Sequence, residues 1–270
     1  MQSAIVHHLR PEFEPVALLW SNDCPEGAVR FRPGRFGCVL FLFGMASKQG
    51  KVTAADRESL ACEGGRAGLG LGVDFDITLG LETYGALFSK GTQAAPDAEA
   101  YARVLEQVPE RFRDLFEFGE RHHCSFERAM DWLQNGLPHY DIPFRYVLFK
   151  PLSQVEDGDN VRTVIFPVTP VELAGLLTLT GSVIPGTDPV QVPQGADCNH
   201  IGSFPYAQGE AEQPRAVLGM TGVDGREAMH TYFRDDVLTL ALPWKLFRQM
   251  EQEAEDSVLQ TPSWKKLIRT

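Results

Sequence analysis

The most constraining feature of the sequence is an order of predicted elements that occurs twice: strand, turn, strand and apolar helix. The first copy has strands over Pro15–Ser21 and Ala28–Phe31 and a buried helix over Arg35–Gln49. The second copy has strands over Arg145–Leu152 and Arg162–Val168 and an apolar helix over Thr169–Ser182. These elements predict an α/β fold, with α+β as the alternative, in which mixed sheet packs against helices.

The parallel between the two copies continues beyond their helices. The second helix opens with a capping signal over Thr169–Glu172, in which threonine, proline and glutamate occupy the favoured positions. After each helix a cysteine leads into a glycine-containing turn, and the spacing from Leu40 to Cys62 is within one residue of that from Leu177 to Cys198. We interpret this as an internal duplication; a chance match within one mixed sheet is the alternative.

The middle of the chain differs from both copies. Residues 97–138 are charged, have helical periodicity, and are broken at Pro109. We therefore predict a first α/β half over residues 1–96, a helical insertion over 97–140 and a second α/β half over 141–270, which together can form one compact domain. We expect the insertion to be peripheral and dispensable for any site. The second half should end with a strand over Val237–Leu242 and an amphipathic helix from Pro243.

Charge and hydropathy restrict the class of function. The 25 basic residues are outnumbered by 36 acidic ones, for a net charge of −11, so the average surface repels nucleic acid and anionic lipid. The longest apolar run, Cys38–Ala46, is half the roughly 18 residues of a membrane span, and the N-terminus lacks the pattern of a signal peptide. Five widely spaced cysteines do not form a secreted disulfide framework. We expect a cytoplasmic protein with reduced thiols that binds neither nucleic acid nor membranes.

The glycine-rich stretch Leu60–Gly72 does not fit a nucleotide motif. A P-loop needs lysine and then serine or threonine after its glycines, but Leu71–Val73 stands there. A dinucleotide fingerprint needs an apolar strand before it, whereas the preceding residues are polar. A nucleotide cofactor is therefore disfavoured, and we interpret the stretch as a turn that lets the backbone approach a ligand or another segment.

Three cysteines are candidate ligands of one cofactor. Cys62 precedes Glu63-Gly64-Gly65 and Cys198 precedes a second glycine-containing turn, so backbone N–H groups could stabilise both thiolates. Cys38, at the start of the first apolar helix, is the third candidate. Three thiolates suit an iron–sulfur cluster or a soft metal, with Gly64, Gly65 and Gly195 allowing close backbone approach. A structural role for all three as small apolar residues is the alternative.

Other functions remain open on the sequence alone. One is a cysteine-dependent enzyme acting on a small anionic or carbonyl substrate. Its nucleophile would be Cys198 or Cys62 and its base His200, and its anion clamps would come from Arg35, Arg66 or Arg215. Another is a small-ligand-binding module without catalysis. The expected partners are a small molecule or a metal, and a homo-oligomer is compatible with these readings.

The segment "ERHHCSFE" contains His122, His123, Cys124 and Glu127. His123 and Glu127 are four residues apart on one predicted helix face, a spacing that can bind zinc. A solvated face is the commoner reason for such a pattern in a polar helix, and we expect that here.

Motifs along the chain carry a resemblance to a known family. They are "EPVALLWS", "RPGRFGCVLFLF", "DRESLACEGGRAGLGLG", "YVLFKPL", "GADCNHIGSFPY", "EQPRAVLGMTGVD" and "DVLTLALPWKLF". From Pro15 to Leu267 the chain resembles the uncharacterised ArCR family, a domain of unknown function of archaea and many anaerobic bacteria. The resemblance implies that Cys38, Cys62 and Cys198 belong to a shared site and that an oxygen-sensitive cluster is compatible with the setting; it implies no established activity.

Overall fold

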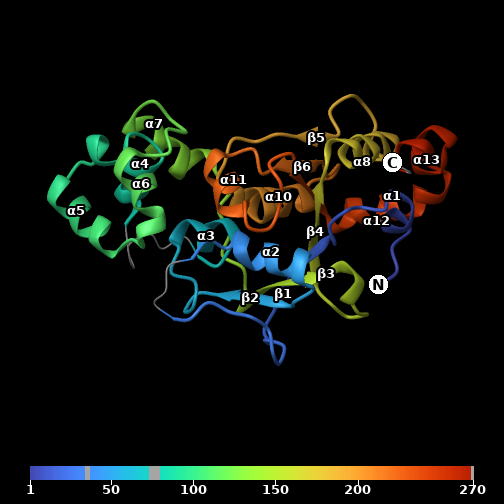
Figure 1. Cartoon of the computed structure of the whole chain (residues 1–270), viewed down its shortest axis with the longest axis horizontal. Coiled ribbons are helices and arrows are strands. Elements are labelled where there is room, and N and C mark those ends of the chain that lie inside the picture. Colours follow the sequence, from blue (N-terminus) through green and yellow to red (C-terminus); the bar gives the residue numbers. More distant parts are fainter. Residues whose placement is uncertain (34–36, 73–79, 269–270) are drawn as a thin grey trace.

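A single mixed sheet organises the protein, for which we describe a computed structural model over residues 1–33, 37–72 and 80–268. Within these residues the sheet has seven strands in the order β2-β3-β1-β4-β7-β6-β5 (Figure 1). The strands are β1 (Val16–Ser21), β2 (Thr53–Asp56), β3 (Tyr146–Pro151), β4 (Val161–Val168), β5 (Val190–Gln191), β6 (Ala216–Gly219) and β7 (Leu238–Pro243). Neighbours pair antiparallel except β5 and β6, which are parallel.

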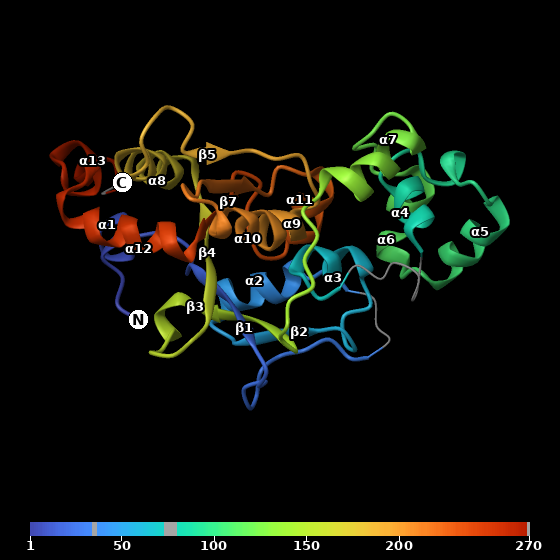
Figure 2. The same cartoon turned by 180° about the vertical axis from the view of Figure 1, so that it is seen from behind.

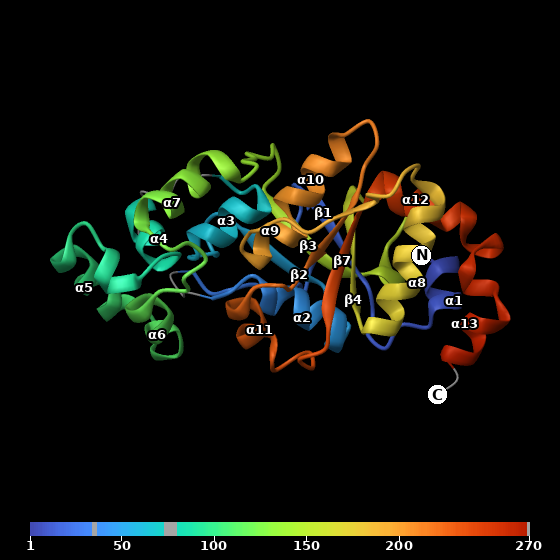
Figure 3. The same cartoon turned by 90° about the horizontal axis from the view of Figure 1, so that it is seen from above.

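Helices cover both faces of the sheet, as the view from above shows (Figure 3). One face carries α1 (Ala4–Leu9), α8 (Pro170–Val183), α12 (Trp244–Glu253) and α13 (Pro262–Leu267). The other carries α2 (Leu40–Gln49), α3 (Glu63–Leu69), α9 (Asp197–Ile201), α10 (Ser203–Glu210) and α11 (Val223–Met229). Alternate strand residues enter the two cores: in β4, Val164 and Phe166 face the first and Ile165 the second. Because both faces are buried, the central strands β1 and β4 have mostly apolar sequences.

A helical lobe, residues 81–136, lies at one end of the molecule (Figures 1 and 2). It comprises α4 (Leu81–Leu87), α5 (Ala98–Gln107), α6 (Glu110–Phe118), α7 (Phe126–Asp131), a 3-10 turn (Gly91–Ala94) and a π-helical turn (Trp132–Gly136). The lobe has its own apolar core, in which Tyr84, Tyr101 and Phe116 are buried. Further 3-10 turns lie at Leu152–Gln154, Ala254–Asp256 and Val258–Gln260.

The predicted mixed α/β architecture is confirmed, but the internal duplication is not shown. The strand expected at Ala28–Phe31 is wrong: this segment is a loop with one bridge, between Val29 and Thr53. The helix expected at Arg35–Gln49 starts at Leu40, with residues 34–36 outside the described ranges. The two helices of the supposed repeat, α2 and α8, lie on opposite faces of the sheet.

Local signals located several other elements, among them β3, β4 and α8, but not the short strands β2, β5 and β6. The Thr169 side chain accepts a hydrogen bond from the Glu172 N–H at 3.5 Å, and the Glu172 carboxylate accepts one from the Thr169 N–H at 2.7 Å. This capping box is the one expected from the sequence. The amphipathic helix predicted from Pro243 is α12, with Leu246, Phe247 and Met250 buried.

Gly68 and Gly202 allow the backbone of α3 to contact the backbone of α9 and of the junction between α9 and α10. A Cβ atom on Gly68 would lie 2.9 Å from both the carbonyl carbon and the Sγ of Cys198, and one on Gly202 would collide with the Gly68 carbonyl oxygen. Backbone atoms cannot move aside as the end of a side chain can. The relative position of α3 and α9 therefore depends on these two residues having no side chain.

We predict that Gly202→Ala lowers the free energy of unfolding by about 2 kcal/mol or more, because the added methyl overpacks a backbone contact. The matched control is Gly181→Ala in α8, where the nearest atom to the new Cβ is Pro189 Cγ at 4.0 Å. That change should raise stability by roughly 0.5 kcal/mol through helix propensity. Urea unfolding measures both effects. Wild-type stability in Gly202→Ala would contradict the close contact.

Candidate functional site

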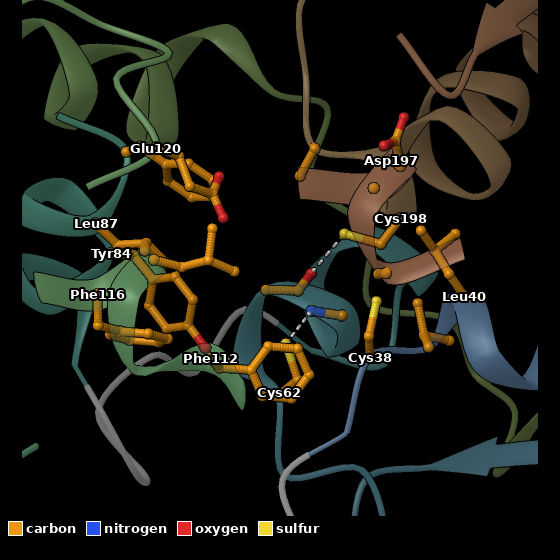
Figure 4. Close-up of a pocket in the computed structure, with 18 residues that line it drawn as sticks. Cys38, Leu40, Cys62, Tyr84, Leu87, Phe112, Phe116, Glu120, Asp197 and Cys198 are labelled. Atoms are coloured by element: carbon orange, nitrogen blue, oxygen red, sulfur yellow. Dashed lines mark hydrogen bonds between the residues drawn. The ribbon is translucent and has the colours of Figure 1, made fainter. Parts of the chain in front are cut away.

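A cavity of about 100 Å³ lies between the helical lobe and the α/β body. We call it the thiol cavity, because Cys38, Cys62 and Cys198 all line it (Figure 4). The close-up shows the cysteines on the side of the α/β body and Tyr84, Leu87 and Glu120 on the side of the lobe. Among the described residues, the lining is Cys38, Val39, Leu40, Cys62, Gly64, Gly65, Tyr84, Leu87, Phe88, Phe112, Leu115, Phe116, Glu120, Ala196, Asp197, Cys198, Gly225 and Ala228.

Each of the three cysteines lies at the beginning of a helix. Cys38 directly precedes Val39, the N-cap of α2, Cys62 is the N-cap of α3, and Cys198 is in the first turn of α9. All three are reduced and partly buried. Residues far apart in the sequence are thus brought to one cavity, as expected for a shared site, whereas Cys24 and Cys124 do not line it.

The Cys62 sulfur is both a helix cap and a wall of the cavity. Its Sγ accepts a hydrogen bond from the Gly65 N–H at 3.3 Å. Burial raises the pKa of the Cys62 thiol, and the Gly65 N–H and the neighbouring Tyr84 hydroxyl oppose the rise without cancelling it. Cys62 is therefore a neutral thiol at neutral pH, the opposite of the activated thiolate that a nucleophile requires.

Cys198 links the starts of two helices. Its thiol donates a hydrogen bond to the Gly64 carbonyl oxygen at 3.4 Å, which joins α9 to the first turn of α3. Cβ atoms on Gly64 and Gly65 would make only ordinary contacts, at 3.4 Å and 3.5 Å. Among protein contacts, clearance is needed at Gly68 and not at these two glycines; close approach of Gly64 and Gly65 to a ligand stays a prediction.

His200 and Gly195 lie beside the thiol cavity but do not line it. The His200 Nδ1 is 2.8 Å from Asp197 Oδ1, and its Nε2 is 3.0 Å from the Pro193 carbonyl oxygen. Both ring nitrogens are thus engaged inside the protein, where His200 is 1% exposed. A Cβ on Gly195 would lie 2.6 Å from the Phe204 ring, so this glycine serves packing against α10.

The arginines considered as anion clamps do not converge on the thiol cavity. Arg66 is buried and pairs with Glu63 within α3, at 3.6 Å. Arg215 pairs with Asp188 at 2.6 Å near β5. Arg35 lies outside the described residues. Neither Arg66 nor Arg215 lines the cavity.

The positions of the His, Cys, Asp and Glu side chains show whether the described residues contain a ready metal site. In residues 1–33, 37–72 and 80–268, no three or more His, Cys, Asp or Glu side chains are grouped so that they could hold one metal ion. The segment His122–Cys124 is included, and His122 pairs with Glu120 at 3.3 Å. Across the same ranges, no helix has the length and apolar content needed to cross a membrane.

Sequence reasoning missed the wall that the helical lobe contributes. Phe112, Leu115, Phe116 and Glu120 line the cavity, so the insertion would contribute to any site formed there, whereas the sequence led us to expect it to be dispensable. The available signal was the spacing of Phe112 and Phe116, which places both rings on one face of α6. The sequence could not show which part of the protein this face contacts, because that is set by the tertiary structure.

The raised pKa of Cys62 predicts a loss of stability in alkaline solution. The unfolded chain ionises this thiol near its ordinary pKa of 9.0, before the folded protein does, so the free energy of unfolding falls as pH rises past that value. Cys62→Ser replaces the sulfur acceptor of the N-cap with an oxygen, and its hydroxyl does not titrate in this range. It should lose less stability than wild type between about pH 8 and about pH 10.

Urea unfolding under reducing conditions measures this difference, and Cys124→Ser, an exposed cysteine outside the cavity, is the control that should behave as wild type. Identical pH dependence in wild type and Cys62→Ser would show that folding does not perturb the Cys62 thiol.

Comparison with known proteins gives a family and no activity. The family model described as Uncharacterised ArCR matches residues 4–253. No curated protein and no solved structure matches the chain. The matched range includes the three cavity cysteines and the helical lobe. The chain belongs to the uncharacterised ArCR family.

Proposed function

We propose that the protein binds a small, largely apolar molecule in the thiol cavity. The observation that carries this proposal is the cavity itself, about 100 Å³ in volume and walled by aliphatic and aromatic side chains from both the lobe and the body. Empty apolar cavities of roughly 150 Å³ take up benzene or xenon. The thiols, the Tyr84 hydroxyl and the carboxylates of Glu120 and Asp197 are the few polar side-chain groups that would orient such a ligand.

Xenon is a suitable probe because the natural ligand is unidentified. In wild-type protein, xenon should cause saturable chemical-shift changes of the Leu40 and Leu87 methyl groups, both of which line the cavity. Ala228→Leu adds bulk at the cavity wall and should abolish these shifts. Ala174→Leu, on the exposed side of α8, is the matched control and should retain them. Absence of saturable shifts in wild type would refute the proposal.

A second candidate is an iron–sulfur cluster bound by Cys38, Cys62 and Cys198. The presence of three thiols in one cavity favours it, and apolar surroundings suit such clusters. The ligands of a cluster bind different iron atoms and so stand farther apart than the ligands of a single ion. The absence of a ready single-ion site among the described residues therefore weighs more against a mononuclear soft metal than against a cluster.

Anaerobic reconstitution with ferrous iron and sulfide tests the cluster. If the cluster forms, wild type should retain iron and acid-labile sulfide after desalting, and Cys38→Ser, Cys62→Ser and Cys198→Ser should each lose most of both. Cys124→Ser should bind as wild type. Wild-type protein without acid-labile sulfide would eliminate this candidate and leave the apolar ligand.

The geometry gives less support to a cysteine-dependent enzyme. Burial raises the pKa of Cys62, the Cys198 thiol donates a hydrogen bond to a backbone carbonyl, and the proposed base His200 is engaged at both nitrogens. A nucleophile needs a deprotonated sulfur and an available base. Neither candidate thiol has both.

A further inference from the structure

A second hollow, on the lobe, has a chemical character opposite to that of the thiol cavity. It has a volume of about 630 Å³ and is lined by Lys90, Arg121, His122, His123, Cys124, Arg128 and Gln194. We call it the cationic pocket. Of the residues that the structure describes, three permanently charged cations and no carboxylate line it, although the protein as a whole carries a net charge of −11. We propose that the cationic pocket binds the phosphate group of a small phosphate ester.

The cations of this pocket are not consumed by ion pairs. Within the described ranges, no carboxylate oxygen lies within 4.0 Å of a side-chain nitrogen of Lys90, Arg121 or Arg128, whereas eight other arginines and lysines form such pairs. Two carboxylates lie nearby: Glu120, which pairs with His122 of the pocket at 3.3 Å, and the exposed Glu127, whose pKa is lowered mainly by hydrogen bonds and in small part by the charge of Lys90. Positive charge concentrated in a hollow attracts anions.

The backbone that carries Arg121 is held in an unusual conformation. Arg121 has φ of +53°, in the left-handed region that non-glycine residues rarely adopt. Three backbone hydrogen bonds maintain it: Glu120 N–H to Leu87 O at 2.7 Å, Arg121 N–H to Ser89 O at 3.0 Å and His123 N–H to Phe88 O at 3.0 Å. Strain that the surroundings enforce is found at functional positions. Here it fixes the point from which the guanidinium extends.

Gln194 closes the pocket from the α/β body. The side-chain Nε2 of Gln194 donates a hydrogen bond to the His122 carbonyl oxygen at 2.9 Å, and the backbone carbonyl oxygen of Gln194 accepts one from Trp132 Nε1 at 3.3 Å. On the lobe side, Arg128 Nη1 donates to Cys124 Sγ at 3.3 Å. The pocket therefore has a defined frame before any ligand arrives, which reduces the entropic cost of binding.

The set of donors favours phosphate over other ligands. Two guanidinium groups can each form paired hydrogen bonds with phosphate oxygens, and an ammonium group adds a third positive charge. A divalent metal ion would be repelled by the same charges, which removes the zinc reading of His123 and Glu127. The thiol cavity plays no part in this inference, which stands or falls independently of the ligand proposed there.

Calorimetric titration of the full-length protein with inorganic phosphate at low ionic strength tests the proposal. Wild type should bind with millimolar or tighter affinity. Arg121→Gln and Arg128→Gln should each weaken binding by about tenfold, because each removes a charge-assisted hydrogen-bonding group. Arg121→Lys should retain part of the affinity. Arg113→Gln, which removes an α6 arginine paired with Glu110, should bind as wild type.

Circular dichroism confirms folding of each variant; if Arg121→Gln unfolds, Arg128→Gln alone decides. Unchanged phosphate affinity in Arg128→Gln, or no binding to wild type at millimolar phosphate, would overturn the proposal. Succinate, a dianion without phosphorus, separates the ligand classes: weaker binding than phosphate supports the assignment, and equal or tighter binding overturns it in favour of a carboxylate site.

Discussion

The backbone contact between Gly68 and Gly202 is the constraint on which the candidate site depends. It lets α3 lie against the chain that runs from α9 into α10, and so brings the N-cap thiol of Cys62 and the first-turn thiol of Cys198 to the same cavity. The hydrogen bond from the Cys198 thiol to the Gly64 carbonyl oxygen joins the first turns of α9 and α3 at this contact. A side chain at either glycine would separate the helices, and the cavity wall formed by their first turns would change shape.

The helical lobe and the α/β body each form part of the wall of the thiol cavity. The body supplies the thiols and the lobe supplies the aromatic and aliphatic wall, so neither part alone encloses the thiol cavity. A third hollow lies between the thiol cavity and the cationic pocket and shares lining residues with both. It shares Leu115 and Glu120 with the thiol cavity, and Arg121, His122 and Gln194 with the cationic pocket. The seam between lobe and body thus passes from an apolar, thiol-rich end to a positively charged end.

The sequence predicted those features that are encoded locally. The strand at Val16–Ser21 and the helix begun by Thr169 follow from apolar runs and a capping box, which need only neighbouring residues. The strand expected at Ala28–Phe31 failed because pairing decides strand formation, and this segment has a single bridge to β2. For the site, the sequence identified three cysteines that line one cavity, but the aromatic wall and the pairing of His200 with Asp197 depend on contacts that only the folded chain creates.

The central claim is that the space between Cys38, Cys62, Cys198 and the lobe is a binding site. A high-resolution crystal structure of protein purified without oxygen, with anomalous data collected at the iron edge, measures this directly. We expect non-protein electron density in the cavity, with an anomalous signal if the occupant is a cluster and without one if it is an apolar molecule. Side chains of the lobe filling the space, with the three sulfurs facing away from one another, would contradict it.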